Sequence, residues 1–195
     1  MNRKTDDKRS DLGEVLDLVE VLYSKDGMKR HQARVQLEKK GRKITPLLIG
    51  ALKSDNTDVR WEAAKALINI KDPLAANALT ESMMDEDYEV RWLAAEALIE
   101  LGEEAIIPLL RKMLGNYDSL YLRKGAHHVL EILKDQGGLD DDTIMVLDEL
   151  GSIMTPEPYP LIARNVLESL LKKKPELKAA EQDTANEHEP ETETA

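Results

Sequence analysis

The sequence predicts an all-α protein, a right-handed α-solenoid of about five helical pairs. Two observations carry this prediction: similar segments recur at a spacing of about 31 residues, and their apolar residues follow helical periodicity. A third observation agrees with it, because no segment shows the alternating β-branched pattern of a strand.

The clearest copies of the repeat are residues 58–70 and 89–101, which are identical at eight of thirteen positions at an offset of 31. A weaker copy begins at Leu122 and a fainter one at Arg30. In residues 58–70 the apolar side chains recur at helical spacing and form one face. These side chains belong to Val59, Ala63, Ala66, Leu67 and Ile70.

The segments between these copies supply the other helix of each unit. Residues 44–48 and 106–110 have proline at the same place and lie 62 residues apart, which is twice the period. Polar links at 54–57 and 85–87 supply N-cap residues and negative charge where the second helices begin. Each unit is therefore predicted to be a pair of helices.

The folded region is predicted to span residues 11–173. Residues 1–10 and the acidic tail 174–195 lack the apolar content to fold, and we expect both to be disordered. Loops at 137–138 and 155–158 mark a divergent last unit, as expected for a terminal repeat with one face in water. The predicted helices pair as 11–24 with 27–40, 43–53 with 57–70, 73–84 with 88–101, 103–115 with 118–134, and 140–151 with 158–172. The corresponding units are 11–40, 43–70, 73–101, 103–134 and 140–172.

The composition excludes several classes of function. The 195 residues contain no cysteine, which excludes disulfides, thiolate zinc sites and a cysteine nucleophile. Because there is no phenylalanine and aromatics make up only 4%, the core must be built from Leu, Ile, Val, Ala and Met. The net charge of −11 disfavours nucleic acid, and no apolar run is long enough for a membrane span. With no signal peptide in residues 1–10, we expect a cytoplasmic monomer.

Few residues suggest chemistry. His127 and His128 are adjacent, so on a helix they point roughly 100° apart and cannot easily share a metal ion. The acidic clusters 85–87 and 140–142 lie where helices begin and are interpreted as caps. The sequence has no glycine-rich phosphate loop and no Gly-x-Ser-x-Gly nucleophile elbow. We expect no catalytic residue, no metal and no cofactor.

The pattern Asp-x-x-x-Val-Arg-x-x-Ala-Ala-x-Ala-Leu, with proline in the preceding helix, resembles a HEAT repeat of the short class. That class includes the HEAT-like repeats of phycobilin lyases, and the likeness covers residues 27–134 well. It implies that the helix with Val-Arg lines the concave side of a curved stack and the helix with proline the convex side. It also implies a ladder of arginines between repeats. We interpret each arginine as paired with an acid five residues before it where one is present. The arginines are Arg30, Arg60, Arg91 and Arg123, and the acids are Asp55, Glu86 and Asp118.

Trp61 and Trp92 occupy the same position in adjacent repeats, beside an apolar face that is complete without them. Because tryptophan is enriched at binding hot spots, this position predicts a stripe that binds a partner. The alternative is that both indoles cover the seam between repeats and complete the core. The candidate stripe, which also includes the flanking repeats and the next helical turn, is His31, Trp61, Lys65, Trp92, Glu96, Lys124 and His128.

The predicted function is a scaffold or adaptor that binds a protein or peptide partner on the concave surface. A first alternative is an accessory subunit of an enzyme, or a phycobilin-lyase-like protein that acts on a tetrapyrrole adduct. A second is a HEAT-like DNA glycosylase, which would need a basic, aromatic-rich groove that the acidic chain argues against.

Overall fold

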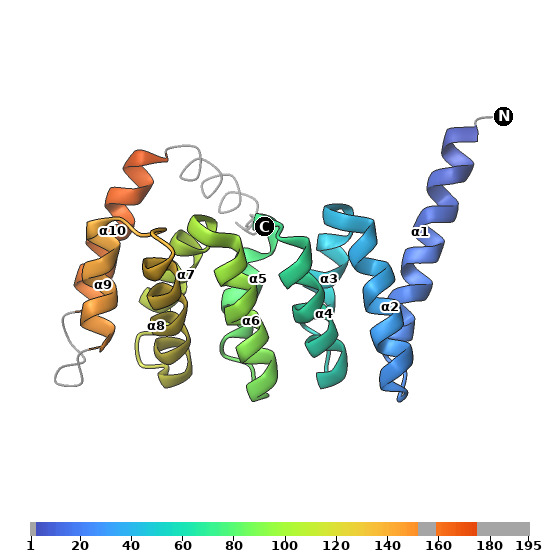
Figure 1. Ribbon diagram of the computed structural model, residues 1–195, viewed down its shortest axis with the longest axis horizontal. Helices are drawn as coiled ribbons and strands as arrows, with labels where there is room; N and C mark the ends of the chain where they lie inside the picture. The colour runs from blue at the N-terminus through green and yellow to red at the C-terminus, as the bar shows by residue number, and fades with distance from the viewer. Residues whose placement is uncertain (1–2, 152–158, 175–195) are drawn as a thin grey trace, which may run out of the picture.

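The computed structural model describes residues 3–151 and 159–174, and over these residues every regular element is a helix (Figure 1). The predicted all-α solenoid is confirmed. The helices are α1 (Arg3–Val21), α2 (Gly27–Lys40), α3 (Thr45–Ala51), α4 (Thr57–Ile70), α5 (Ala76–Ser82), α6 (Tyr88–Leu101), α7 (Ile106–Gly115), α8 (Leu120–Asp135), α9 (Asp141–Gly151) and α10 (Tyr159–Lys173). Three short 3₁₀ helices join successive units, namely η1 (Gly41–Ile44), η2 (Pro73–Ala75) and η3 (Gly102–Ala105).

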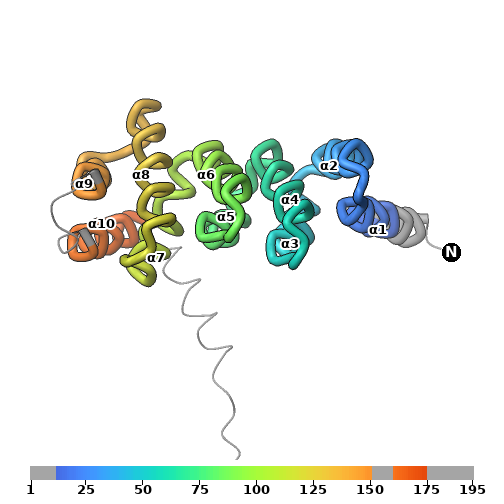
Figure 2. Tube along the Cα trace, turned by 90° about the horizontal axis from the view of Figure 1, so that it is seen from below, coloured from blue at the N-terminus to red at the C-terminus, as the bar shows by residue number. Residues whose placement is uncertain are grey.

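The helices form two layers, which Figure 2 shows end-on. We call the layer of α2, α4, α6, α8 and α9 the front layer, and the layer of α1, α3, α5, α7 and α10 the back layer. Within the front layer α4 packs against α2 and α6, and α6 packs against α8. Contacts such as α3 with α4 and α5 with α6 join the two layers.

The last pair, which the sequence predicts to be divergent, reverses the order of the layers. In the first four pairs the first helix lies in the back layer, whereas here α9 packs beside α8 and α10 packs beside α7. The cause is the link at 136–140, which has no 3₁₀ helix to carry the chain to the back layer. Instead, Gly137 has a φ of +74° and the amide of Gly138 donates to the carbonyl of Leu133 at 2.8 Å, a glycine C-cap that turns the chain back beside α8.

At the N-terminus, α1 begins at Arg3, within the segment 1–10 for which the sequence predicts disorder. Extending an existing helix adds one hydrogen bond per residue, whereas starting one is unfavourable. Polar residues can therefore prolong a helix that is packed further along, as α1 is at Val15 and at Leu22 directly after its end. The predicted tail lies outside the described residues except for Lys174.

The core contains the small and aliphatic residues that the composition requires. Ala63, Ala64, Ala94 and Ala95 are all at most 3% exposed, so their helices approach closely. The second helices of the first three units begin at the predicted residues because side chains cap them there. The caps are Asp26, Asn56 and Asp87.

Three arginines of the predicted ladder fix the turns between paired helices. Each donates from Nη1 to the carbonyl oxygen six residues before it. The pairs are Arg30 with Ser24 at 2.8 Å, Arg60 with Ser54 at 2.9 Å and Arg91 with Asp85 at 2.6 Å.

For Arg30 and Arg60 the carboxylate partner belongs to the next repeat, which corrects the interpretation that Arg60 pairs with the side chain of Asp55. Arg30 pairs with Asp58 at 3.0 Å, and Arg60 pairs with Asp85 at 2.8 Å. Asp55 offers Arg60 only its backbone carbonyl. The hydrogen bond to Asp85 is the largest influence on the Arg60 guanidinium and raises its pKa. The ladder therefore joins consecutive repeats across their seams.

A candidate protein-binding surface

All seven residues of the predicted stripe lie on front-layer helices, but six of them divide between two hollows that are two repeats apart. Trp92, Lys124 and His128 line a pocket between α6 and α8, with Glu96 beside it. His31 and Trp61 line a groove between α2 and α4. Lys65 is half-buried on α4 and lines neither hollow.

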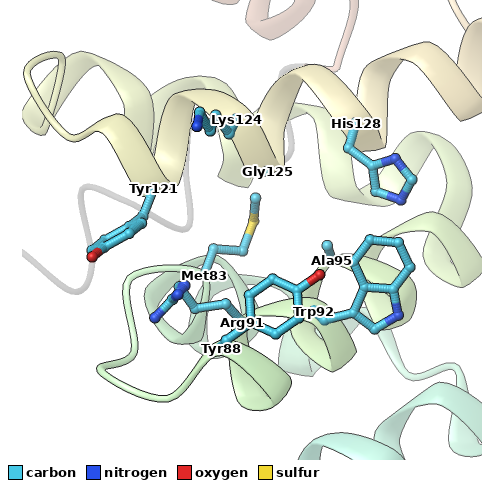
Figure 3. Close-up of a pocket in the computed structure, with 9 residues that line it drawn as sticks. All are labelled: Met83, Tyr88, Arg91, Trp92, Ala95, Tyr121, Lys124, Gly125 and His128. Carbon is cyan, nitrogen blue, oxygen red and sulfur yellow. The ribbon is translucent and has the colours of Figure 1, made fainter.

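The pocket between α6 and α8, called here the α6–α8 pocket, has a volume of about 290 Å³ (Figure 3). Each helix contributes four residues spaced i, i+3, i+4 and i+7, which is one face of a helix. Met83, which caps the C-terminus of α5, completes the lining. The face of α6 is Tyr88, Arg91, Trp92 and Ala95, and the face of α8 is Tyr121, Lys124, Gly125 and His128.

The pocket exists because Gly125 has no side chain. A Cβ at this position would lie 2.5 Å from Cε of Met83, which points toward Gly125 in Figure 3. The equivalent position of the preceding repeat holds Leu93, which is 7% exposed and belongs to the core between α4 and α6. One repeat earlier the position holds Glu62. The same repeat position therefore holds Glu62 in α4, Leu93 in α6 and Gly125 in α8. Only the glycine leaves space for a pocket beside it.

One wall of the pocket is a pair of stacked rings. The indole of Trp92 and the imidazole of His128 lie with centroids 4.9 Å apart and planes 26° from parallel. The His128 Nε2 atom lies 3.6 Å from Oε1 of Glu96. Trp92 is nevertheless 45% exposed, so much of the indole still faces solvent.

The opposite wall is built around Arg91. Its guanidinium carbon lies 4.2 Å from the centroid of the Tyr121 ring and 5.7 Å from that of Tyr88, at cation–π distance. Because Nη1 is also fixed by the carbonyl of Asp85, the arginine holds both tyrosines in place. Tyr88 and Tyr121 are 65% and 56% exposed.

The groove between α2 and α4, called here the α2–α4 groove, is larger, at about 480 Å³, and lined mainly by charged residues. Glu62 is 4% exposed, and its carboxylate accepts a 2.8 Å hydrogen bond from Nε of Arg34. His31 Nδ1 lies 2.8 Å from Nη2 of the same arginine. Trp61 packs against the core and is half-buried, so it is less available than Trp92.

A family model described as HEAT repeats matches residues 15–88 and 82–182, most of the chain. The chain belongs to the HEAT-repeat family. Its match to a solved structure agrees with this, because the HEAT array resembles a chain from the complex of CpcE and CpcF of phycocyanin lyase from Nostoc sp. PCC7120. The two share 20% identity at a TM-score of 0.56, over 78% of this chain and 99% of that one. None of the curated proteins compared with the chain matches it.

Over the described part of this HEAT array, no helix is long and apolar enough to cross a bilayer. His127 lies outside the pocket, with Nδ1 at 3.8 Å from Glu131, so the two adjacent histidines face different neighbours. No group of three or more potential metal ligands occurs among the described residues.

Sequence reasoning missed several residues of the pocket in this HEAT array. Tyr88 and Tyr121 are not in equivalent repeat positions, and Gly125 lies within the weaker repeat copy that begins at Leu122. One signal was available: of the two tryptophans and five tyrosines in the chain, four fall between residues 88 and 121. A concentration of aromatics in a chain so poor in them indicates a surface with a function other than packing.

Proposed function

We propose that this HEAT-repeat chain is a scaffold or adaptor that binds a protein or peptide partner on its front layer. The α6–α8 pocket is the main anchor point of this surface. The single observation that carries the proposal is an exposed Trp92 held against His128 at the edge of a hollow. The family resemblance assigns this layer to the concave side of the stack. The proposal includes a monomeric cytoplasmic chain with no catalytic residue of its own.

The chemistry of the pocket supports protein binding. Trp, Tyr and Arg are the residues that most often dominate the binding energy of interfaces, and all three occur around this hollow. Because Arg91 and His128 hold the rings in place, these side chains would lose little entropy when a partner binds. The apolar floor of Met83 and Ala95 offers surface that an inserted side chain would remove from water.

The test is partner recovery by Trp92→Ala compared with the parent protein and with Tyr23→Ala. Tyr23 is 52% exposed and lies outside the pocket, so it controls for loss of a surface aromatic. Partners from the native cell, identified by mass spectrometry, should be recovered by the parent and by Tyr23→Ala. They should be lost with Trp92→Ala while its circular dichroism and melting temperature stay close to those of the parent. Equal recovery by all three proteins refutes the proposal.

A second candidate function is an accessory subunit of an enzyme, or a phycobilin-lyase-like protein that acts on a tetrapyrrole adduct. The observation that favours it is the fold likeness, which extends over 99% of a chain from a complex of two phycocyanin lyase subunits. A flat aromatic wall of the kind that Trp92 and His128 form also suits a planar tetrapyrrole. Mixing the protein with a free bilin should then shift the bilin absorbance, and Trp92→Ala should reduce the shift. An unchanged spectrum eliminates this candidate.

A further inference from the structure

We infer that the partner presents an apolar or aromatic side chain flanked by carboxylates to the α6–α8 pocket, and a cationic side chain to the α2–α4 groove. This inference rests on the proposed function and names the chemistry of the partner. It follows from the opposite charge of two hollows on one face of the array.

The α6–α8 pocket is basic at its rim and apolar at its floor. The nine residues that line it include two cations, Arg91 and Lys124, and no acid, while Glu96 beside the pocket faces His128. The sequence as a whole has 38 acidic residues against 27 lysines and arginines, so an acid-free lining is unusual for this chain. Lys124 is exposed and lies next to Gly125 in sequence, at the edge of the hollow. A carboxylate beside the inserted side chain would therefore meet a positive rim.

The α2–α4 groove has the opposite character. Its lining contains two arginines, Arg30 and Arg34, and four acids. Both arginines are already paired, with Asp58 at 3.0 Å and with Glu62 at 2.8 Å. The excess negative charge comes from the two acids contributed by the start of α6, which are Asp87 and Glu89. A lysine or arginine of the partner fits this groove.

The spacing of the hollows sets the spacing of the partner's side chains. The two seams are two helix positions apart, since α4 and α6 separate the groove at α2–α4 from the pocket at α6–α8. At 8–10 Å between packed helices this is roughly 16–20 Å. An extended chain rises about 3.3 Å per residue, so about five or six residues separate the apolar anchor from the cationic side chain.

The experiment uses two synthetic peptides of identical composition, each with one tryptophan, acidic residues and lysines joined by a Gly-Ser spacer. In the matched peptide the acids flank the tryptophan and the lysines follow about six residues later. In the swapped peptide the lysines flank the tryptophan and the acids are distal. Because net charge is equal, general attraction to the protein is the same for both. Binding to the full chain is followed by fluorescence anisotropy at low and at physiological salt.

We expect the matched peptide to bind about tenfold or more tighter than the swapped one, with a preference that declines as salt rises. Lys124→Glu should remove that preference, and Lys172→Glu, an exposed lysine of α10, should leave it unchanged. Equal affinities, a tighter swapped peptide, binding of neither peptide, or insensitivity to Lys124→Glu each overturns the inference. A chain ending at residue 174 that binds the matched peptide several-fold tighter makes the protein's own acidic tail the occupant and also overturns it. Failure of the proposed function is detected separately, by the recovery of native partners with Trp92→Ala.

Discussion

The imidazole of His128 stacks on the indole of Trp92 across the seam between α6 and α8, with ring centroids 4.9 Å apart. The histidine fixes the indole from the neighbouring repeat while leaving it 45% exposed. Two helices that come from different units thus cooperate in presenting one side chain. A contact of this kind reduces the entropy that a binding residue would otherwise lose.

We predict that His128→Ala weakens partner binding by less than Trp92→Ala does. The change releases the indole without removing it, so the loss should be the cost of ordering one side chain, about 0.5–1.5 kcal/mol. Because about 31% of the His128 side chain is exposed and the residue is not part of the hydrophobic core, thermal unfolding should change little. The measurement is a dissociation constant for each variant with the recovered partner. An effect of His128→Ala as large as that of Trp92→Ala contradicts this account.

The two tryptophans should differ in their contribution to stability. Trp61 is half-buried and packs against the core, so Trp61→Ala should lower the free energy of unfolding by about 2 kcal/mol or more. Trp92 is 45% exposed, so Trp92→Ala should cost about 1 kcal/mol or less. Chemical denaturation of both variants gives the comparison. If Trp92→Ala costs more stability than Trp61→Ala, Trp92 is a core residue and does not form an exposed wall of the α6–α8 pocket.

The buried pair of Arg34 and Glu62 should show strong coupling. Glu62→Leu removes the 2.8 Å partner of the mostly buried Arg34 and leaves Glu38 as its remaining carboxylate. The cost should therefore fall below the about 3–5 kcal/mol of a buried pair that is broken completely. Arg34→Ala combined with Glu62→Leu copies the pair at the equivalent positions of the next seam, Ala64 of α4 and Leu93 of α6, and should recover much of the loss. A double-mutant cycle by denaturant unfolding measures the coupling. If the change in unfolding free energy of the double variant equals the sum of the two single changes, the two residues are not coupled and the prediction is wrong.

Lys71 is the C-cap of α4, a position that glycine occupies at the ends of α2 and α6. Its φ is +50°, in the left-handed region, and Gly41 and Gly102 at the equivalent positions have φ of +69° and +64°. A side chain in this conformation costs roughly 1 kcal/mol, so Lys71→Gly should raise stability. Its exposed ion pair with Glu100 offsets only a little of that gain. Gly102→Ala is the matched control and should lower the melting temperature; a Lys71→Gly variant that melts earlier than the parent refutes the prediction.

Asp140 should make stability dependent on acid pH. Its carboxylate accepts hydrogen bonds from the hydroxyl of Thr143 at 2.6 Å and from Lys173 at 2.9 Å. The bond from Thr143, more than any other influence, lowers the pKa of Asp140 below its ordinary value of 3.8. The unfolded state therefore binds a proton first, so this contribution is complete above about pH 3.8 and is lost as the pH falls through the lower folded pKa.

The measurement for this prediction is the melting temperature of the parent and of Asp140→Asn from neutral pH down to strongly acid pH. The two proteins should differ at neutral pH and converge in acid. Lys172→Ala, an exposed change on the same helix as Lys173, controls for general charge effects. A constant difference at all pH values would show that the carboxylate charge plays no part.

The sequence was sufficient for the helices because their signals are local. The caps Asp26, Asn56 and Asp87 each lie directly before the helix that they start, and the repeat aligns them. The reversed order of α9 and α10 was not predictable in this way. It depends on how a glycine turn after α8 directs the chain, and on the packing of α10 beside α7.

Only the part of the site that follows the sequence repeat was predictable. Trp92 was found because it has an equivalent in Trp61, which is a property of the sequence repeat. The opposite faces of α6 and α8 meet at an offset of 33 residues, as Tyr88 and Tyr121 do, and not at the repeat offset. The hollow further depends on Met83, which approaches Gly125 from another unit. Contacts of this kind are set by the seam and have no periodic signature in the sequence.

The reversed last pair has a consequence for self-association. A solenoid whose units are all alike offers, at one end, the surface that its other end needs, so copies can join head to tail into an open fibre. Here α9 runs back beside α8 and occupies the front-layer position where a further unit would place a parallel helix. The rotation that relates one repeat to the next therefore has no counterpart between two molecules. The helix α9 thus blocks head-to-tail stacking of a second molecule at this end, and we expect the protein to remain unpolymerised even at high concentration.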